Sequence, residues 1–333
     1  WYIPKLPLGD FEYNGKSSQG DAFFVAPNPP FGAIFTYYLN EGLKSAEETR
    51  REKEKAIEEE GGDTPYPGWD ALRAEEIEDA PAVILTVSDA AGNIIRKVEG
   101  PVEAGFHRVS WDLRYPISNA WAPEPVADQW MEIPGPLAVP GTYQVSLAKR
   151  VDGVLTPLGE PQSFNVVSIS ESALPGASPE QMTAFVLRLD ELNRRVSGAK
   201  AAIDAMLTET RAIKQTLQRS SAPSALREQA LAIEKQLLAL QQELSGNDRR
   251  ALYNSGGPVS ISARLEAVVT GTFRSTYGPT PNLEQNVDIA EQALDSVSIE
   301  IDRINGDALP SLRAQLDAEN VPWTPGRGIS AGD

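Results

Sequence analysis

The side chains best suited to chemistry in this sequence are one histidine and a nearby tryptophan–aspartate pair. His107 is the only histidine, and Trp111-Asp112 follow it in the same alternating stretch. A general base needs a substrate or nucleophile within hydrogen-bond distance, and the sequence supplies none near His107. An aromatic ring beside a carboxylate is one way to hold a sugar. We expect a structural role for both features, with sugar contact as the alternative for the pair.

Adjacent carboxylates carry little information in this chain. Glycoside hydrolysis uses two carboxylates about 5–10 Å apart across a cleft. The sequence holds 47 Asp and Glu residues, so pairs such as Glu75/Glu76 and Glu58/Glu59 arise without selection for catalysis. We expect these pairs to face solvent, and we predict no catalytic residue.

The segment 115–139 is the preferred binding candidate, because aromatic and acidic side chains gather there. Such side chains grip sugar or protein surfaces when they are exposed. The alternative is that this segment packs against the rest of the protein. The candidate binding residues are Tyr115, Trp121, Glu124, Asp128 and Trp130.

Composition excludes several classes of site. The absence of cysteine rules out disulfides, thiol catalysis and cysteine-ligated metals, and a single histidine rules out multi-histidine metal sites. We predict neither a metal nor a cofactor. The net charge of −17 argues against nucleic acid and against an anionic membrane surface as partners. No run approaches the roughly 20 apolar residues of a membrane span, so we expect no direct membrane insertion.

Two halves of the sequence follow different hydrophobic periods. Residues 1–170 alternate with period two, which is typical of strands, and residues 178–320 repeat every three or four positions, which is typical of amphipathic helices. Short alternating strands with Gly/Pro turns indicate a β-sandwich, so we predict an α+β fold. The predicted strands are 33–39, 82–88, 93–98, 106–114, 142–150 and 162–168.

A charged insertion, residues 40–80, separates the first two predicted strands. Residues 41–60 carry eight acidic and five basic side chains, and pairs such as Arg50/Glu54 have the i,i+4 spacing that stabilises an exposed helix. Apolar residues are too few for a broad buried stripe. We expect a solvated helix, with an acidic docking helix as the alternative.

The second half predicts an antiparallel, up-and-down helical bundle, because short breaks separate long amphipathic stretches. Ser178 is a suitable N-cap for the first helix, and Ser221 or Ser224 for the second. Asn305-Gly306 is expected to end the fourth helix. The first helix is longer than its neighbour, so Phe185, Leu189 and Leu192 need cover; we expect it from within the chain. The predicted helices are 179–219, 223–245, 258–276, 282–305 and 309–318.

The strand half resembles the Ig-like, fibronectin-III-like module of flagellar hook-capping type. The module places the tryptophan in the sandwich core and the following aspartate at the strand end, which the resemblance implies for Trp111 and Asp112. The insertion 40–80 and the long loop 115–139 depart from the pattern. The matching residues are Tyr37 to Leu39; Val87, Asp89, Gly92 and Ile95; Gly105, His107, Trp111 and Asp112; Pro140, Gly141 and Tyr143.

The order of segments resembles the C-terminal region of bacterial sortilin-like, BNR-repeat β-propeller proteins, which are often labelled glycosyl hydrolases. A lead-in Phe24-Val25-Ala26-Pro27-Asn28-Pro29-Pro30-Phe31-Gly32-Ala33 precedes the module, and a helical region follows it. The resemblance implies propellers upstream of Trp1 and export to the periplasm, cell surface or medium. The predicted division is 1–31 leading in from a propeller, 32–170 as the sandwich, 178–320 as the bundle and 321–333 as a C-terminal tail.

Two hypotheses about function remain open from the sequence. The first is a non-catalytic accessory or scaffold region that docks a protein partner or the upstream propeller. The second is a part of a carbohydrate-active or carbohydrate-binding protein whose active site lies in those propellers. Neither assigns a catalytic residue to this chain.

Overall fold

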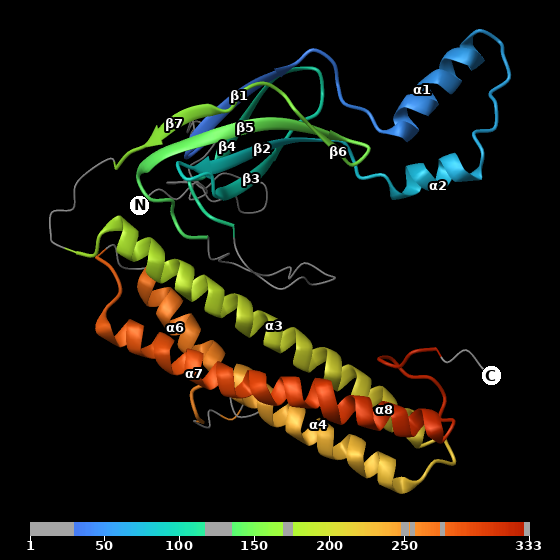
Figure 1. Ribbon diagram of the computed structural model, residues 1–333, viewed down its shortest axis with the longest axis vertical. Coiled ribbons are helices and arrows are strands. Elements are labelled where there is room, and N and C mark those ends of the chain that lie inside the picture. The colour runs from blue at the N-terminus through green and yellow to red at the C-terminus, as the bar shows by residue number, and fades with distance from the viewer. Residues whose placement is uncertain are drawn as a thin grey trace, which may run out of the picture. The chain divides into compact units, whose positions relative to one another are not determined.

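The computed structural model describes residues 30–116, 135–168, 176–247, 253, 257–273 and 277–329, and combines helices with antiparallel sheets. The described residues form two compact units, which are treated separately. Unit 1 comprises residues 30–116 and 135–168 and holds every described strand (Figure 1). Unit 2 comprises the described residues from 176 to 329 and is helical.

Unit 1 contains two antiparallel sheets. Strands β1 and β4 form one sheet, and the other follows the order β3-β2-β5-β6, with β7 also paired to β5. The six predicted strands are all present. The seventh, β6, was not predicted from the sequence. The strands are β1 (Ala33–Leu39), β2 (Ala82–Asp89), β3 (Ile94–Gly100), β4 (Gly105–Trp111), β5 (Gly141–Val151), β6 (Val154–Pro157) and β7 (Gln162–Val166).

The missed strand β6 follows a two-residue hairpin. Asp152 and Gly153 both have positive φ, 50° and 69°, as the tight turns of two-residue hairpins require. The turn pairs Val151 with Val154 and lets β6 return along β5. An Asp-Gly pair between apolar residues is a hairpin signal, so the sequence did contain the information.

Both sheets contribute side chains to the core of unit 1. Trp111 on β4 is 1% exposed and packs edge-on against Tyr143 on β5 and Phe164 on β7. Tyr37 on β1 lies in a second cluster with Val83 on β2. These contacts follow from the period-two pattern, which sends alternate side chains to one face of each strand.

The insertion between β1 and β2 forms two helices, α1 (Ala46–Glu59) and α2 (Trp69–Ile77). The sequence predicted one exposed helix here. The break at Gly61-Gly62 and the Pro-rich stretch before Gly68 divide the segment, because glycine and proline end helices.

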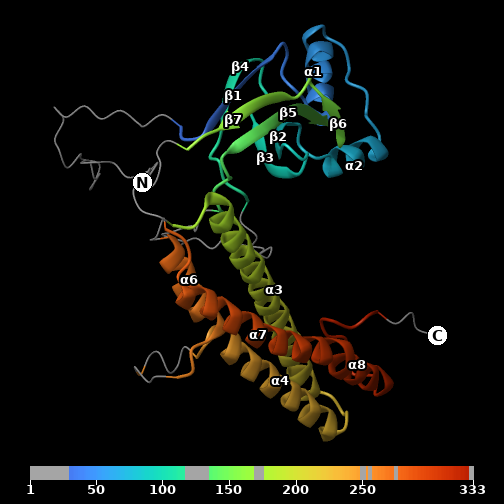
Figure 2. The same ribbon diagram turned by 60° about the vertical axis from the view of Figure 1, so that its left-hand side comes forward.

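The described helices of unit 2 share one hydrophobic core. Ser178 caps α3: its hydroxyl accepts a hydrogen bond from the Gln181 backbone, and the Gln181 side chain accepts one from the Ser178 N–H, as the S-x-x-Q spacing predicts. These helices lie side by side in Figures 1 and 2. They are α3 (Pro179–Leu217), α4 (Ser224–Ser245), α6 (Ile261–Phe273), α7 (Pro281–Arg303) and α8 (Leu309–Ala318).

The expected cover of the first helix is confirmed. Phe185, Leu189 and Leu192 are buried in the same core cluster as residues of α4, α6, α7 and α8. The stripe is therefore covered within the chain, where each buried apolar side chain contributes about 1.5–3 kcal/mol.

Two expected helix boundaries are wrong. Asn305-Gly306 does not end a helix, because a π-helical turn, η1 (Ile304–Ala308), carries α7 directly into α8. Ile304 and Leu309 on either side of this turn are fully buried, and their burial holds the chain helical despite the glycine. Neither serine of the preceding break caps α4 either: Pro223 is its N-cap and Ser224 is its first residue.

Residues after α8 fold back onto unit 2. Val321 and Thr324 are buried, and the Arg327 guanidinium binds Asp317 and donates to the Pro322 carbonyl oxygen at 2.8 Å. Residues 321–329 of the segment expected as a C-terminal tail therefore make contacts with unit 2.

Candidate docking surface

The binding residues expected from the sequence are only partly within the described structure. Trp121, Glu124, Asp128 and Trp130 lie outside the described residues. Tyr115 is half-buried and packs against the cluster around Trp111, and burial raises its pKa. Its backbone N–H donates to the Pro136 carbonyl oxygen at 2.9 Å. Tyr115 thus contributes to packing.

His107 and Trp111 on β4, and Asp112 just after it, were the candidates for catalysis or sugar contact. Each makes a contact within unit 1. The indole N–H of buried Trp111 donates to the Arg114 carbonyl oxygen at 2.9 Å, and the Asp112 carboxylate accepts from the Arg114 N–H at 3.1 Å. Nε2 of His107 lies 2.7 Å from the Glu103 carbonyl oxygen, and its ring packs on Tyr37 at 5.2 Å between centroids. These contacts agree with a structural role for Trp111, Asp112 and His107, and that role stays a prediction.

The described residues include no cluster of three or more acidic or histidine side chains placed to hold a metal ion. Within those same residues, no helix is both long and apolar enough to cross a bilayer.

A pocket of about 490 Å³ lies beside the insertion. Its lining mixes charged and aliphatic side chains and pairs no nucleophile with a general base. One oxygen of Glu78, Oε1, is buried without a hydrogen-bond partner. The lining residues are Lys44, Ala46, Thr49, Arg50, Lys53, Ala74, Glu78, Val151 and Asp152.

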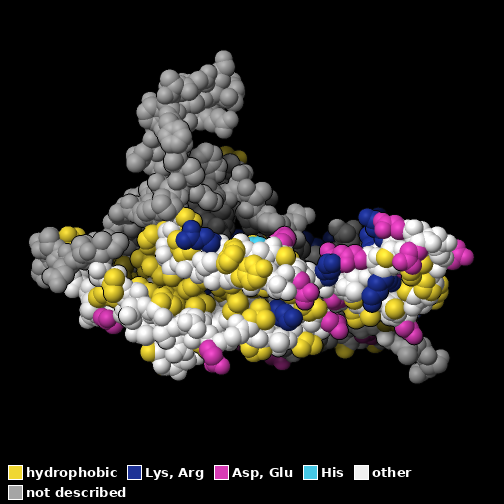
Figure 3. Space-filling model, turned by 90° about the horizontal axis from the view of Figure 1, so that it is seen from above, with side chains coloured by type: hydrophobic (Ala, Val, Ile, Leu, Met, Phe, Trp, Pro, Cys, Tyr) yellow, Lys and Arg dark blue, Asp and Glu magenta, His cyan; other side chains and the backbone are white. Residues whose placement is uncertain are grey.

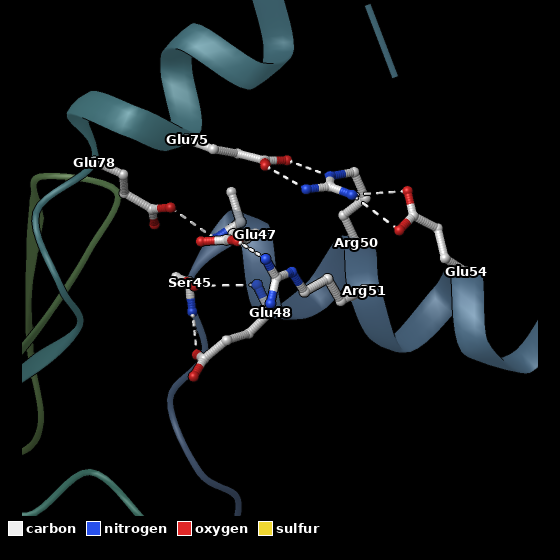
Figure 4. A network of polar contacts seen from close by, with 9 residues as sticks. Ser45, Glu47, Glu48, Arg50, Arg51, Glu54, Glu75 and Glu78 are labelled. Carbon is white, nitrogen blue, oxygen red and sulfur yellow. Dashed lines mark hydrogen bonds and ion pairs between the residues drawn. The ribbon is translucent and has the colours of Figure 1, made fainter. Parts of the chain in front are cut away.

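Arg50 joins the two helices of the insertion (Figure 4). Its Nε and Nη2 donate to the two carboxylate oxygens of Glu75 on α2, at 2.7 Å each. Its Nη1 donates to both oxygens of Glu54, one turn along α1, at 2.8 and 2.9 Å. The hydrogen bonds from Arg50 lower the pKa of Glu75, and Glu75 and Glu54 raise the pKa of Arg50. This paired geometry fixes both distance and angle between α1 and α2.

A second contact ties the end of α2 to the start of α1. Oε2 of Glu78 accepts a hydrogen bond from the Ala46 N–H, the first of the unpaired donors of α1, at 2.8 Å. Ser45 and Glu48 complete the end as a capping box, at 3.1 and 2.9 Å. Polar contacts therefore hold the two helices together.

Neither helix of the insertion buries a residue. Trp69 is 71% exposed and Ile77 is 83% exposed, and their spacing of eight residues places them on one face of α2. Tyr66 packs edge-on against Trp69, with ring centroids 5.9 Å apart. We call Tyr66, Trp69 and Ile77 the aromatic face. The contacts of Glu75 and Glu78 use another side of α2.

A second exposed apolar surface lies on the sheet of β1 and β4. Tyr38 and Phe106 are cross-strand partners with ring centroids 4.8 Å apart, and Phe106 is 79% exposed. Ile34 is exposed on the same side of β1. Figure 3 shows apolar side chains gathered over the strands and charged ones gathered toward the insertion.

The sequence reading did not identify the aromatic face. Tyr66 and Trp69 stand among Pro and Gly residues, and the high charge of the insertion predicts a solvated helix. The available signal was a Trp at the start of a short helix with four charged residues among its nine. Such a helix cannot bury a Trp by itself, which favours an external contact.

Comparison with known proteins adds no relative. The chain matches no family model, no curated protein and no solved structure.

Proposed function

We propose that this chain is a non-catalytic docking region of a larger exported protein, with the insertion as its partner-binding element. The observation that carries the proposal is the insertion itself: two helices fixed by ion pairs present Tyr66, Trp69 and Ile77 outward and bury nothing. A docking interface needs such a rigid, exposed apolar group surrounded by polar residues.

The free energy available from burying Trp69 and Ile77 favours a protein partner that covers the aromatic face. Burying one large apolar side chain contributes roughly 1.5–3 kcal/mol, which this chain leaves unused at Trp69 and Ile77. Ordering a helix in water costs conformational entropy, and a short helix without a core is marginal. A partner that covers the face would supply the missing burial.

The proposal also covers the fold type of each unit and the longer protein to which this chain would belong. We propose that unit 1 is an Ig-like sandwich of hook-capping type and unit 2 an antiparallel up-and-down bundle. Two antiparallel sheets around Trp111, and long helices joined by short connections, support this. We propose upstream propellers and an exported location from the resemblance to sortilin-like, BNR-repeat proteins.

Affinity purification from the native host tests the docking role. The bait is the full chain as wild type, Trp69→Ala or Ile77→Ser, with Phe106→Ala as an exposed aromatic control. We expect one protein, identified by mass spectrometry, to be retained by the wild type and the control and lost from both insertion variants. Equal recovery from all four baits would contradict the proposal.

The outer face of β1 and β4 favours a second candidate, carbohydrate binding, because Tyr38 and Phe106 expose adjacent rings. The Tyr38 ring, with an apolar body and a polar hydroxyl tip, suits a surface that stays partly wet. Glycan-array binding that is lost in Phe106→Ala and kept in Trp69→Ala would support this candidate. Absence of any glycan signal from the wild type would exclude it.

A further inference from the structure

Six carboxylates close in sequence to the aromatic face have no partner among the described residues. Six exposed acidic side chains between the last turn of α1 and the end of the insertion make no ion pair or side-chain hydrogen bond with any described residue. We call them the free carboxylates. They are Glu58, Glu60, Asp63, Asp70, Glu76 and Asp79.

The other acidic residues of 45–79 make ion pairs or hydrogen bonds. Glu54 and Glu75 bind Arg50, Glu47 binds Arg51, and Glu52 binds Lys44. Residues 45–79 carry thirteen acidic and five basic side chains, a net charge of −8. Among the described residues of this segment, the six free carboxylates outnumber the two basic side chains that make no ion pair, Lys53 and Arg73. Arg73 lies between Trp69 and Ile77 on the same face of α2, and the excess charge of the segment is still negative.

We infer that the occupant of the aromatic face is a basic protein segment that carries an apolar side chain among Lys and Arg residues. The inference rests on the proposed docking function and names the chemistry of its partner. Charge complementarity selects the sign of the partner, because like charges facing an interface oppose binding. An anionic membrane surface and nucleic acid are both disfavoured by the same field.

The two features of the site have separate roles. The free carboxylates attract a cationic segment over distances near the Debye length and speed its association. The aromatic face supplies the buried anchor, and burial at the centre of an interface sets the dissociation rate. Raising the salt concentration should therefore weaken binding mainly by lowering the association rate constant. Trp69→Ala should weaken it mainly by raising the dissociation rate constant.

Titration of the full chain with synthetic peptides tests this inference. The probe is an amphipathic Lys/Leu helix of about 18 residues, patterned with one apolar stripe. Matched peptides replace Lys with Glu, or Leu with Ser. We expect binding of the Lys/Leu peptide alone, at least tenfold tighter than either matched peptide. Raising the salt from about 0.1 M to about 1 M, which shortens the screening length from about 10 Å to about 3 Å, should weaken it at least tenfold.

A charge-neutralised variant locates the contact. Glu58→Gln/Glu60→Gln/Asp63→Asn removes three free carboxylates from the segment that precedes Tyr66. The control, Glu243→Gln/Asp302→Asn/Asp307→Asn, removes three exposed carboxylates of unit 2 that also lack partners among the described residues. Both variants change the net charge equally. We expect at least a fivefold loss of Lys/Leu peptide affinity in the first and less than a twofold change in the second.

The outcomes separate this inference from the docking proposal. Equal loss in both charge variants, or equal binding of the Lys/Leu and Glu/Leu peptides, would overturn the inference. If the partner purified through Trp69 proves acidic at its contact, the docking role stands and the basic chemistry is wrong. If Trp69→Ala retains every partner and binds the Lys/Leu peptide as the wild type does, the docking proposal and the inference of a basic partner are both wrong.

Discussion

The helices of the insertion and the helices of unit 2 are held in place by different kinds of contact. In unit 2 the described helices share one apolar core, with Leu192, Leu237 and Leu294 at most 1% exposed. In the insertion, α1 and α2 bury nothing and meet through Arg50–Glu75 and Glu78–Ala46. Apolar burial stabilises a fold by itself, whereas exposed ion pairs contribute little and mainly fix geometry.

The comparison therefore assigns different roles to similar elements. Unit 2 uses its apolar side chains for its own stability. The insertion leaves Tyr66, Trp69 and Ile77 in solvent and uses its charges to orient them. Substitutions in the first region should lower the free energy of unfolding, and those in the second should change binding and local order.

The largest effect is expected at Leu189. Leu189→Asp places a charge in the unit 2 core and should lower the free energy of unfolding by about 4 kcal/mol or more, without a change in oligomeric state. Leu187→Asp, on the more exposed side of α3, should cost less than about 1 kcal/mol. Urea denaturation and analytical ultracentrifugation give both quantities. A folded Leu189→Asp chain that loses an oligomer would instead show that this stripe is an interface.

A smaller loss of stability is expected at Gly326, where the chain folds back onto unit 2. Gly326 has φ of +85°, and an added Cβ would lie 2.3 Å from Cδ of Glu209, whose carboxylate accepts two hydrogen bonds of 2.7 Å from Arg313. Gly326→Ala should cost about 1–3 kcal/mol from the left-handed backbone and the displaced ion pair.

Gly328→Ala is the matched control, because open space surrounds that position and its φ is not in the left-handed range. Thermal denaturation of the two variants separates the site-specific cost from a general effect of alanine. Equal melting temperatures would show that the contact of Gly326 with Glu209 adds no stability.

Substitution of Arg50 should loosen the insertion without changing the stability of the whole protein. Arg50→Gln removes the contacts with Glu75 and Glu54, so protease cleavage within 45–79 should accelerate several-fold. The free energy of global unfolding should change little, because exposed ion pairs contribute little to stability. Arg51→Gln, which removes one exposed pair with Glu47, should change neither.

The pH dependence of the insertion should be the smallest effect and should follow Glu75. Its pKa is lowered in the folded protein by the hydrogen bonds from Arg50. The stabilisation is thus complete above the unfolded-state pKa of glutamate, about 4.3, and is lost as the pH falls through the lower folded value. The protection factors of the α1 and α2 amides, which correct for the intrinsic pH dependence of exchange, should fall at acidic pH in the wild type and stay unchanged in Arg50→Gln. A parallel pH response in Arg50→Gln would exclude Glu75 as the cause.

Local signals in the sequence predicted most of the secondary structure. Ser178 and Gln181 identified the start of α3, and period-two alternation identified the strands around Trp111. The predictions failed where tertiary burial overrides a local rule, as at Asn305-Gly306, where buried Ile304 and Leu309 keep the chain helical. The short strand β6 was missed although Asp152-Gly153 signalled its turn.

The candidate surface was harder to predict, because it depends on contacts distant in sequence. The pairing of Arg50 with Glu75 spans 25 residues, and no local spacing rule identifies it. The low apolar content of the insertion predicts a solvated helix, with an acidic docking helix as the alternative. Only the structure shows that the few apolar residues, Trp69 and Ile77, share one uncovered face.

Photo-cross-linking in the native host tests the central claim most directly. Benzoylphenylalanine replaces Ile77 on the aromatic face or Ile299 on α7, which are 83% and 67% exposed. The account predicts one discrete adduct from position 77, mapped to a single partner protein, and none of that mass from position 299. No adduct at 77, or the same adduct from both positions, would contradict the claim that the insertion is a docking element.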